Sequence, residues 1–194
     1  MKNIIRLLPA LGLLAALPLR ADDATDNIDA AKAAYEAGNY SEAITALDTA
    51  NQFIRQKKAE EVVKLLPAAP KDWEASEPET EAAASSILGG GVTAKRTYTR
   101  GNSIVTVKVQ SDSTVMQYAA MLSNPMLLAA SGAKMETIKG QRVTVECKSG
   151  DDNGNIKAVV DGRYLVEIEG TGITIDDLRT FAKAFDFAKL AAMK

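Results

Sequence analysis

The hydrophobic and polar positions of the chain follow two different periods. Residues 25–66 carry apolar positions at helical spacing, are rich in alanine and are interrupted by Gly38-Asn39. This pattern predicts an antiparallel helix pair followed by a further short helix, and we assign the helical hairpin to residues 22–66. From Val92 onward the period approaches two, which is the spacing of strands that bury one face.

Six strand candidates follow this change of period, and most are separated by turn residues such as Arg100-Gly101-Asn102. The candidates are residues 92–99, 103–110, 133–138, 141–148, 155–160 and 163–169. Short connections predict antiparallel neighbours. Further helices are expected over 114–122, 126–130 and 175–193, the last capped by Thr174. The expected fold is α+β: after the hairpin, residues 92–194 form an antiparallel sheet of about five to six strands covered by helices.

Residues 67–91 differ in composition from both neighbours. Prolines at 67, 70 and 78 lie among glutamates, and the segment ends in three glycines at 89–91. We therefore predict an acidic, Pro/Gly-rich linker. Trp73, the only tryptophan, is expected to pin this segment to the folded body.

The amino terminus has the profile of a cleavable signal peptide. Lys2 and Arg6 precede an apolar run over residues 7–17, and small Ala21 stands just before two aspartates. We assign residues 1–21 to the signal peptide, with cleavage near Ala21. A membrane anchor is the alternative, but the run is shorter than the roughly 20 residues that span a bilayer. No lipidation cysteine lies nearby, so we expect a released periplasmic or secreted protein without an integral membrane segment after cleavage.

The charge balance argues against nucleic acid as a partner. The chain has 23 basic and 25 acidic residues; loss of Lys2, Arg6 and Arg20 with the leader leaves 20 against 25, a net charge of −5. Phosphate binding needs clustered positive charge. Nucleic acid and anionic membrane surfaces are therefore not expected partners.

The chain contains no histidine. Histidine is the commonest general base and the commonest metal ligand, so Ser-His-Asp hydrolases and His-ligated zinc or haem sites are excluded. No catalytic motif is present either. We predict a protein that is not an enzyme, with no catalytic residue, no metal site and no cofactor.

Cys147 is the only cysteine, so the chain cannot form an intrachain disulfide. It continues the alternation of Val143 and Val145, which places its thiol on the apolar face of a strand. We expect a buried, inert thiol, with an intermolecular disulfide or a reactive thiol as the alternatives.

Two segments resemble known families. Within residues 28–61, the small and aromatic positions Ala31, Tyr35, Gly38, Tyr40 and Ala43, continued by a leucine and an alanine, resemble one tetratricopeptide repeat. A lone helical hairpin is the alternative, because the pattern occurs once. Residues 92–194, with the meander over 162–170 leading into a terminal helix, resemble the PsbP-like exported α+β domains. That resemblance concerns architecture and implies no active-site residue.

Methionines are dense between the second and third strands, at 116, 121, 126 and 135. Their spacing does not keep to one helical face, which favours core filling over a thioether metal site. If the region is exposed, it is a candidate apolar ligand or partner surface made of Met116, Met121, Met126 and Leu127. We therefore expect a protein-binding or scaffold module whose partner is another exported or envelope protein. The alternative is a carrier of a small apolar ligand or lipid in a pocket between sheet and helices.

Three further clusters contain polar or charged groups without forming a recognisable catalytic or metal-binding motif. The oxygen-rich segment 151–155 lacks the glycine and glutamate positions of a calcium loop. Ser111 and Ser113 with Lys108 hold the groups of a Ser-Lys nucleophile but no motif. A third group, Lys95, Arg96 and Arg100 with Glu167 and Glu169, predicts cross-strand ion pairs on a solvent face if the strands are neighbours.

Overall fold

The computed structural model describes residues 23–82, 91–111, 115, 118–119, 126, 132–147 and 152–193. The predicted signal peptide, including Ala21, lies outside these residues. So do most of the helices expected over 114–122 and 126–130.

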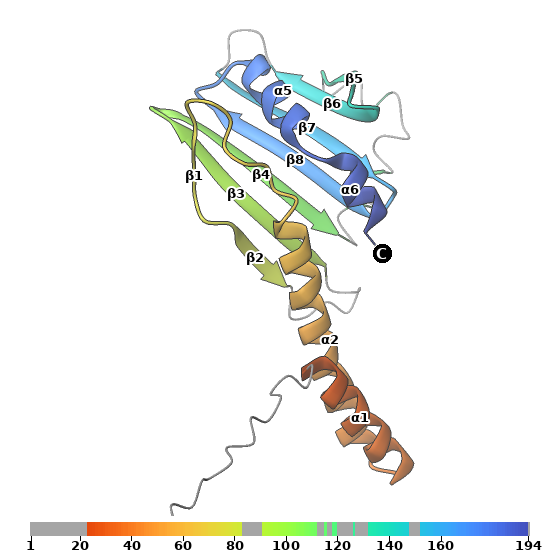
Figure 1. Cartoon of the computed structure of the whole chain (residues 1–194). Coiled ribbons are helices and arrows are strands. Elements are labelled where there is room, and N and C mark those ends of the chain that lie inside the picture. Colours follow the sequence, from red (N-terminus) through yellow and green to blue (C-terminus); the bar gives the residue numbers. More distant parts are fainter. Residues whose placement is uncertain are drawn as a thin grey trace, which may run out of the picture.

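One antiparallel sheet of eight strands organises the described chain (Figure 1). The strands are β1 (Glu74–Ala75), β2 (Glu79–Ala82), β3 (Val92–Arg100), β4 (Ser103–Ser111), β5 (Lys134–Ile138), β6 (Gln141–Cys147), β7 (Asn153–Val160) and β8 (Tyr164–Thr171). Their order is β1-β3-β4-β8-β7-β6-β5, and β2 also pairs with β3. The α+β class is confirmed, but the sheet is larger than the five to six strands expected.

The two additional strands come from the segment predicted to be a linker. Residues 74–75 and 79–82 pair with the outer side of β3, so 67–82 belongs to the folded body. The prolines fit this arrangement because an edge strand does not need every backbone donor. Trp73 is buried and packs edge-on against Phe181, with ring centroids 5.1 Å apart, as its role as a pin requires.

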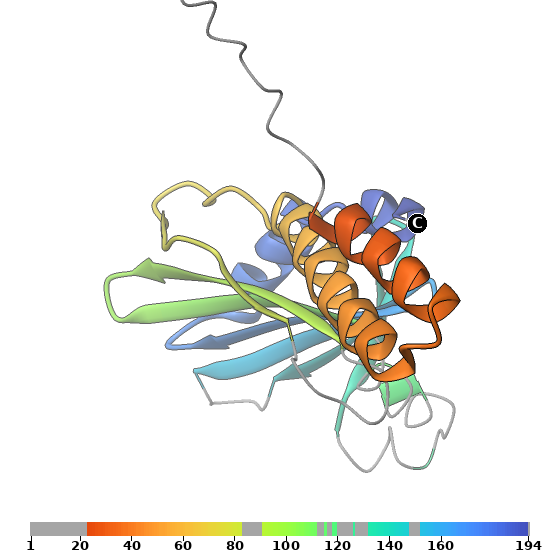
Figure 2. The ribbon, with the colours of Figure 1, turned by 90° about the horizontal axis from the view of Figure 1, so that it is seen from below.

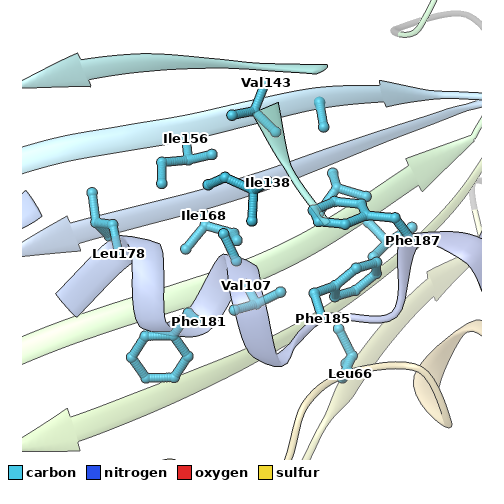
Figure 3. Packing of buried hydrophobic residues seen from close by; sticks show 14 of the residues in the cluster. Leu66, Val107, Ile138, Val143, Ile156, Ile168, Leu178, Phe181, Phe185 and Phe187 are labelled. Atoms are coloured by element: carbon cyan, nitrogen blue, oxygen red, sulfur yellow. The ribbon is translucent and has the colours of Figure 1, made fainter. Parts of the chain in front are cut away.

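The hydrophobic core lies on one face of the sheet, beneath α5 (Ile175–Ala184) and α6 (Phe187–Ala192). Alternate residues of β4, β8 and β7 point to this face, and the phenylalanines of the two helices close it from above (Figure 3). The labelled residues from the sheet are Val107, Ile138, Val143, Ile156 and Ile168. Leu178 and Phe181 come from α5, Phe187 comes from α6, and Phe185 lies between the two helices.

The expected terminal helix is two helices. Phe185 leaves the helical conformation and is fully buried, and Asp186 caps α6 by accepting a hydrogen bond from the Lys189 amide at 3.0 Å. The Thr174 cap is confirmed. Its hydroxyl accepts from the Asp177 amide at 3.2 Å, and the Asp177 carboxylate accepts from the Thr174 amide at 2.9 Å.

Replacing Thr174 by alanine is expected to lower the free energy of unfolding by about 1 kcal/mol, because it removes half of this reciprocal capping pair. Chemical denaturation measures the loss. Thr180→Ala, on the exposed side of the same helix, is the matched control and is expected to leave stability unchanged within about 0.5 kcal/mol. Equal losses in both variants would contradict the role of the cap.

The helical hairpin consists of α1 (Asp23–Glu36) and α2 (Tyr40–Val63). The hairpin breaks at Gly38, whose positive φ of 79° fits a helix end. Between there and residue 66, all of it described, α2 is a single helix that continues to Val63, so the expected third short helix is not formed. Alanines form the contact between the two helices, namely Ala24, Ala31, Ala34, Ala43 and Ala50. The C-terminal part of α2 packs on β2 and β3, whereas α1 and the N-terminal part of α2 extend beyond the sheet (Figure 1). Figure 2 shows the two helices of the hairpin lying side by side.

The prediction that Cys147 is buried is wrong, because its side chain is exposed. It does lie on the helix-covered side of β6, in line with Val143 and Val145, and pairs across from Gly154 of β7. However, Cys147 is the last residue of its strand, and alternation alone does not bury a residue where the covering layer ends.

Candidate functional site

Exposed apolar side chains are concentrated on the helical hairpin. Of the nine large apolar side chains that are exposed in the described part of the chain, six lie on α1 and α2. We name this set the hairpin surface: Ile28, Tyr35, Tyr40, Ile44, Leu47 and Ile54, each between 44% and 66% exposed. A cluster of this kind marks an interaction surface more often than single scattered apolar residues do.

The local sequence explains why these side chains face outward. On each helix they lie along one flank of the row of alanines that fills the α1–α2 contact, as the neighbours Ala43 and Ile44 illustrate. Because the helices are antiparallel, the same rotation on each places both rows on one face of the hairpin. The Tyr35 and Tyr40 rings, with centroids 5.6 Å apart, join the two rows.

A second candidate is the polar face of the sheet, opposite α5 and α6. The strand register aligns one residue from each strand except β1 across it: Glu79, Lys95, Lys108, Glu167, Lys157, Thr144 and Met135. Glu167 is central, with a side chain only 9% exposed, and its two oxygens accept from Lys108 and Lys157 at 2.8 Å each. At the β2 edge Lys95 pairs with Glu79 at 3.1 Å.

The ion pairs on this face keep Glu167 ionised and Lys157 protonated. Burial raises the pKa of Glu167, but the bonds from Lys108 and Lys157 and from Glu169 outweigh it and lower that pKa to about 2. The pKa of Glu169 is raised, first by its hydrogen bond with Glu167. Burial opposes the charge of Lys157, yet its bond to Glu167 raises its pKa overall. An ionised carboxylate and a protonated lysine are poor proton shuttles near neutral pH.

Tyr118 lies over this network. Its hydroxyl shares a 2.5 Å hydrogen bond with the Thr144 hydroxyl, and its ring lies 5.7 Å from the Lys157 ammonium. Burial raises the pKa of Tyr118 above its ordinary value. Beyond Thr144, a half-open pocket of about 520 Å³ is lined by Met135, Gly140, Gln141, Arg142, Val143, Thr144 and Val159.

The cross-strand ion pairs predicted for Glu167 occur, but with different partners. The neighbours of β8 are β4 and β7, so Glu167 meets Lys108 and Lys157 rather than residues of β3. Arg96 and Arg100 point to the helix-covered side. There Arg96 donates to the Ser76 carbonyl at 2.7 Å, and Arg100 bonds to Asp177 at 2.8 Å.

Ser111 and Lys108, two members of the supposed Ser-Lys site, lie on opposite faces of the sheet. Ser111 is buried on the helix-covered face, where its hydroxyl accepts from the Val92 amide at 3.1 Å, whereas Lys108 lies on the polar face. Ser113 is outside the described residues. Within the described ranges, no group of three or more cysteine, aspartate and glutamate side chains could hold a metal ion.

Of the predicted apolar surface, only Met126 is described, and it is 80% exposed. Met116, Met121 and Leu127 lie outside the described residues. The core cluster lies between the sheet and the helices α5 and α6. The ligand pocket was predicted beneath residues 116–130, most of which lie outside the described residues. The hairpin surface was missed, although Tyr40, Ile44, Leu47 and Ile54 carry a readable signal: a second apolar row beside the alanine row.

Comparisons with known proteins found no similar protein. Scans against protein-family models, curated proteins and solved structures each returned no match to this chain. None of the described helices combines the length and the apolar character needed to cross a membrane. The candidate site therefore depends on the geometry of the chain itself.

Proposed function

We propose that this chain is an exported protein-binding module whose helical hairpin docks an α-helix of a protein partner. The observation that carries the proposal is the hairpin surface, in which six large apolar side chains are exposed on one face of two helices. Such a face stays in water at a cost of roughly 25 cal/mol for each Å² of apolar area, a cost that a partner removes.

The spacing of the surface favours a helical partner. Apolar anchors at intervals of three, four and seven residues form a ridge that fits the groove of another helix. The alanine contact between α1 and α2 also buries little area, since each methyl group contributes only about 0.8 kcal/mol. A partner helix would supply the larger apolar contacts that the hairpin lacks.

The sheet acts as the rigid support in this proposal. Its core is closed by α5 and α6, and its polar face is occupied by the Glu167 ion pairs. The leader predicted at residues 1–21 directs the module out of the cytoplasm, so its partner is expected among exported or envelope proteins.

The proposal is tested by placing a photo-crosslinking amino acid at Leu47 in cells that express the full chain. We expect a covalent adduct of a defined larger mass from this position. The matched control is the same substitution at Ile104, an apolar residue of the sheet with a similar exposure of 45%.

An adduct from Leu47 that is lost when Ile44 is changed to glutamate, with none from Ile104, supports docking on the hairpin surface. Equal yields from Leu47 and Ile104, or no adduct from Leu47, would overturn it. The glutamate variant must retain the helical circular dichroism of the parent chain, so that loss of the adduct reports loss of contact.

A further inference from the structure

We infer that the helix docking on α2 is α2 of a second copy of this chain, so that the protein is a parallel two-fold dimer joined through its hairpins. This inference rests on the proposed function, because it names the occupant of the hairpin surface. Three features carry it: the spacing of the exposed row on α2, the polar residue within that row, and the free projection of the hairpin.

The exposed row on α2 has the spacing of a coiled-coil seam. Tyr40, Ile44, Leu47, Asn51 and Ile54 follow one another at steps of four, three, four and three residues, and all five are exposed. Alternation of three and four is the a/d pattern that places one narrow stripe against another helix. A helix packed on a globular core shows a broader stripe, and that stripe would be buried.

The residue types in the seam favour two parallel strands. The steps put Ile44 and Asn51 at a positions and Leu47 and Ile54 at d positions. Ile44 at a with Leu47 at d is the combination that favours a two-stranded coil, and the single asparagine at a, Asn51, fixes the register and limits the number of strands. A matched register lets the two Asn51 amides bond to each other across the dimer axis, which satisfies polar groups inside an otherwise apolar seam.

The shape of the molecule leaves the seam accessible to a second copy. Figure 1 shows α1 and the N-terminal part of α2 projecting past the end of the sheet. Ile28 and Tyr35 of α1 flank the seam, and the Tyr35–Tyr40 ring contact makes the surface continuous. A copy related by a two-fold axis presents the identical surface, so each apolar row meets another apolar row.

The charges beside the seam are compatible with this pairing. Asp48 occupies the e position on the flank of α2 that faces away from its own α1, and Lys32 lies on the outer flank of α1. In a parallel pair, α1 of one copy runs along that flank of the other copy. Asp48 and Lys32 of opposite copies then face each other as charges of opposite sign.

Sedimentation equilibrium of the purified chain without residues 1–21 tests the inference. We expect a monomer–dimer equilibrium whose dimer fraction rises with concentration. Ile44→Glu is expected to weaken the dimer by about a hundredfold or more, because it buries two unpaired carboxylates in the seam. Ile104→Glu on the sheet is the matched control and is expected to leave the dissociation constant unchanged.

Cysteine crosslinking in a Cys147→Ser background tests the orientation. A parallel register predicts that the Ile54→Cys chain forms a disulfide with itself. Gln52→Cys, exposed on the same helix but away from the seam, is the control that should not. Disulfides formed only in mixtures of Ile54→Cys and Tyr40→Cys chains would show an antiparallel pair and overturn the parallel arrangement.

Asn51→Leu tests whether Asn51 limits the number of chains in the assembly, because a residue that only supports the fold would not affect that number. It is expected to tighten association while producing trimers or larger species beside dimers, since the residue that limits strand number is lost. A monomer at every concentration, or a dimer indifferent to Ile44→Glu, would overturn the inference. A monomer that keeps its Leu47 adduct to another protein would leave the proposed function standing and reject only the second copy as its partner.

Discussion

Replacing Phe181 by alanine is expected to lower the free energy of unfolding by about 3 to 5 kcal/mol. The ring is fully buried, and its centroid lies 5.1 Å from that of Trp73 and 4.7 Å from that of Tyr98. Its loss leaves a cavity where α5, β3 and the segment before β1 meet. The substitution therefore weakens the packing of all three of these segments.

Urea denaturation measures this loss, and the fluorescence of Trp73, the only tryptophan, reports on the same contact. We expect the emission of the folded variant to shift to longer wavelength as water reaches the indole. Ile104→Ala, which shortens an exposed side chain, is the control and should change stability by less than about 0.5 kcal/mol. A loss below about 1 kcal/mol in Phe181→Ala would contradict this account of the core.

Replacing Glu167 by glutamine is expected to cost about 2 to 3 kcal/mol of stability at neutral pH. The change keeps the size of the side chain but leaves Lys108 and Lys157 without their shared negative partner. The pKa of Glu167 is about 2 in the folded chain, below the ordinary 4.5. Its stabilising contribution is therefore complete above pH 4.5 and is lost as the pH falls toward 2.

Denaturation curves measured across that pH range test whether the stability contributed by Glu167 is lost as the pH falls. The stability difference between the parent chain and Glu167→Gln should shrink from pH 4.5 downward. Glu79→Gln, which removes an ion pair with an exposed carboxylate, should show no comparable change. The pKa of Glu169 should also fall toward its ordinary value in Glu167→Gln, because the neighbouring carboxylate that raises it is gone. A constant difference between parent and variant would contradict the account.

The central strands could be predicted because each carries its own alternation. Val105, Val107 and Val109 of β4 show a clear period of two, and β8 follows it closely enough to be found. The edge strands could not. β1 and β2 are short and charged, and they form only because β3 offers them an unpaired edge, which is a property of the assembled sheet.

The candidate site was less accessible from sequence, because burial depends on what covers a residue. The same helical period that predicted the hairpin did not say which apolar row would be covered. Alanines took the contact between the helices, and the larger residues such as Ile44 and Leu47 stayed outside. Likewise, Lys157 as the second partner of Glu167 follows from the order β4-β8-β7, which local patterns do not contain.

Because α2 is continuous, docking on the hairpin surface is expected to affect the stability of the core. One unbroken helix carries Leu47 on the exposed seam and, four turns later, Val62 in the core beside Leu66. If the proposed partner binds the seam, it stabilises this helix and with it the folded core, by an amount set by the concentration and affinity of the partner. The proposal therefore predicts that the melting temperature of the chain rises with the concentration of its partner.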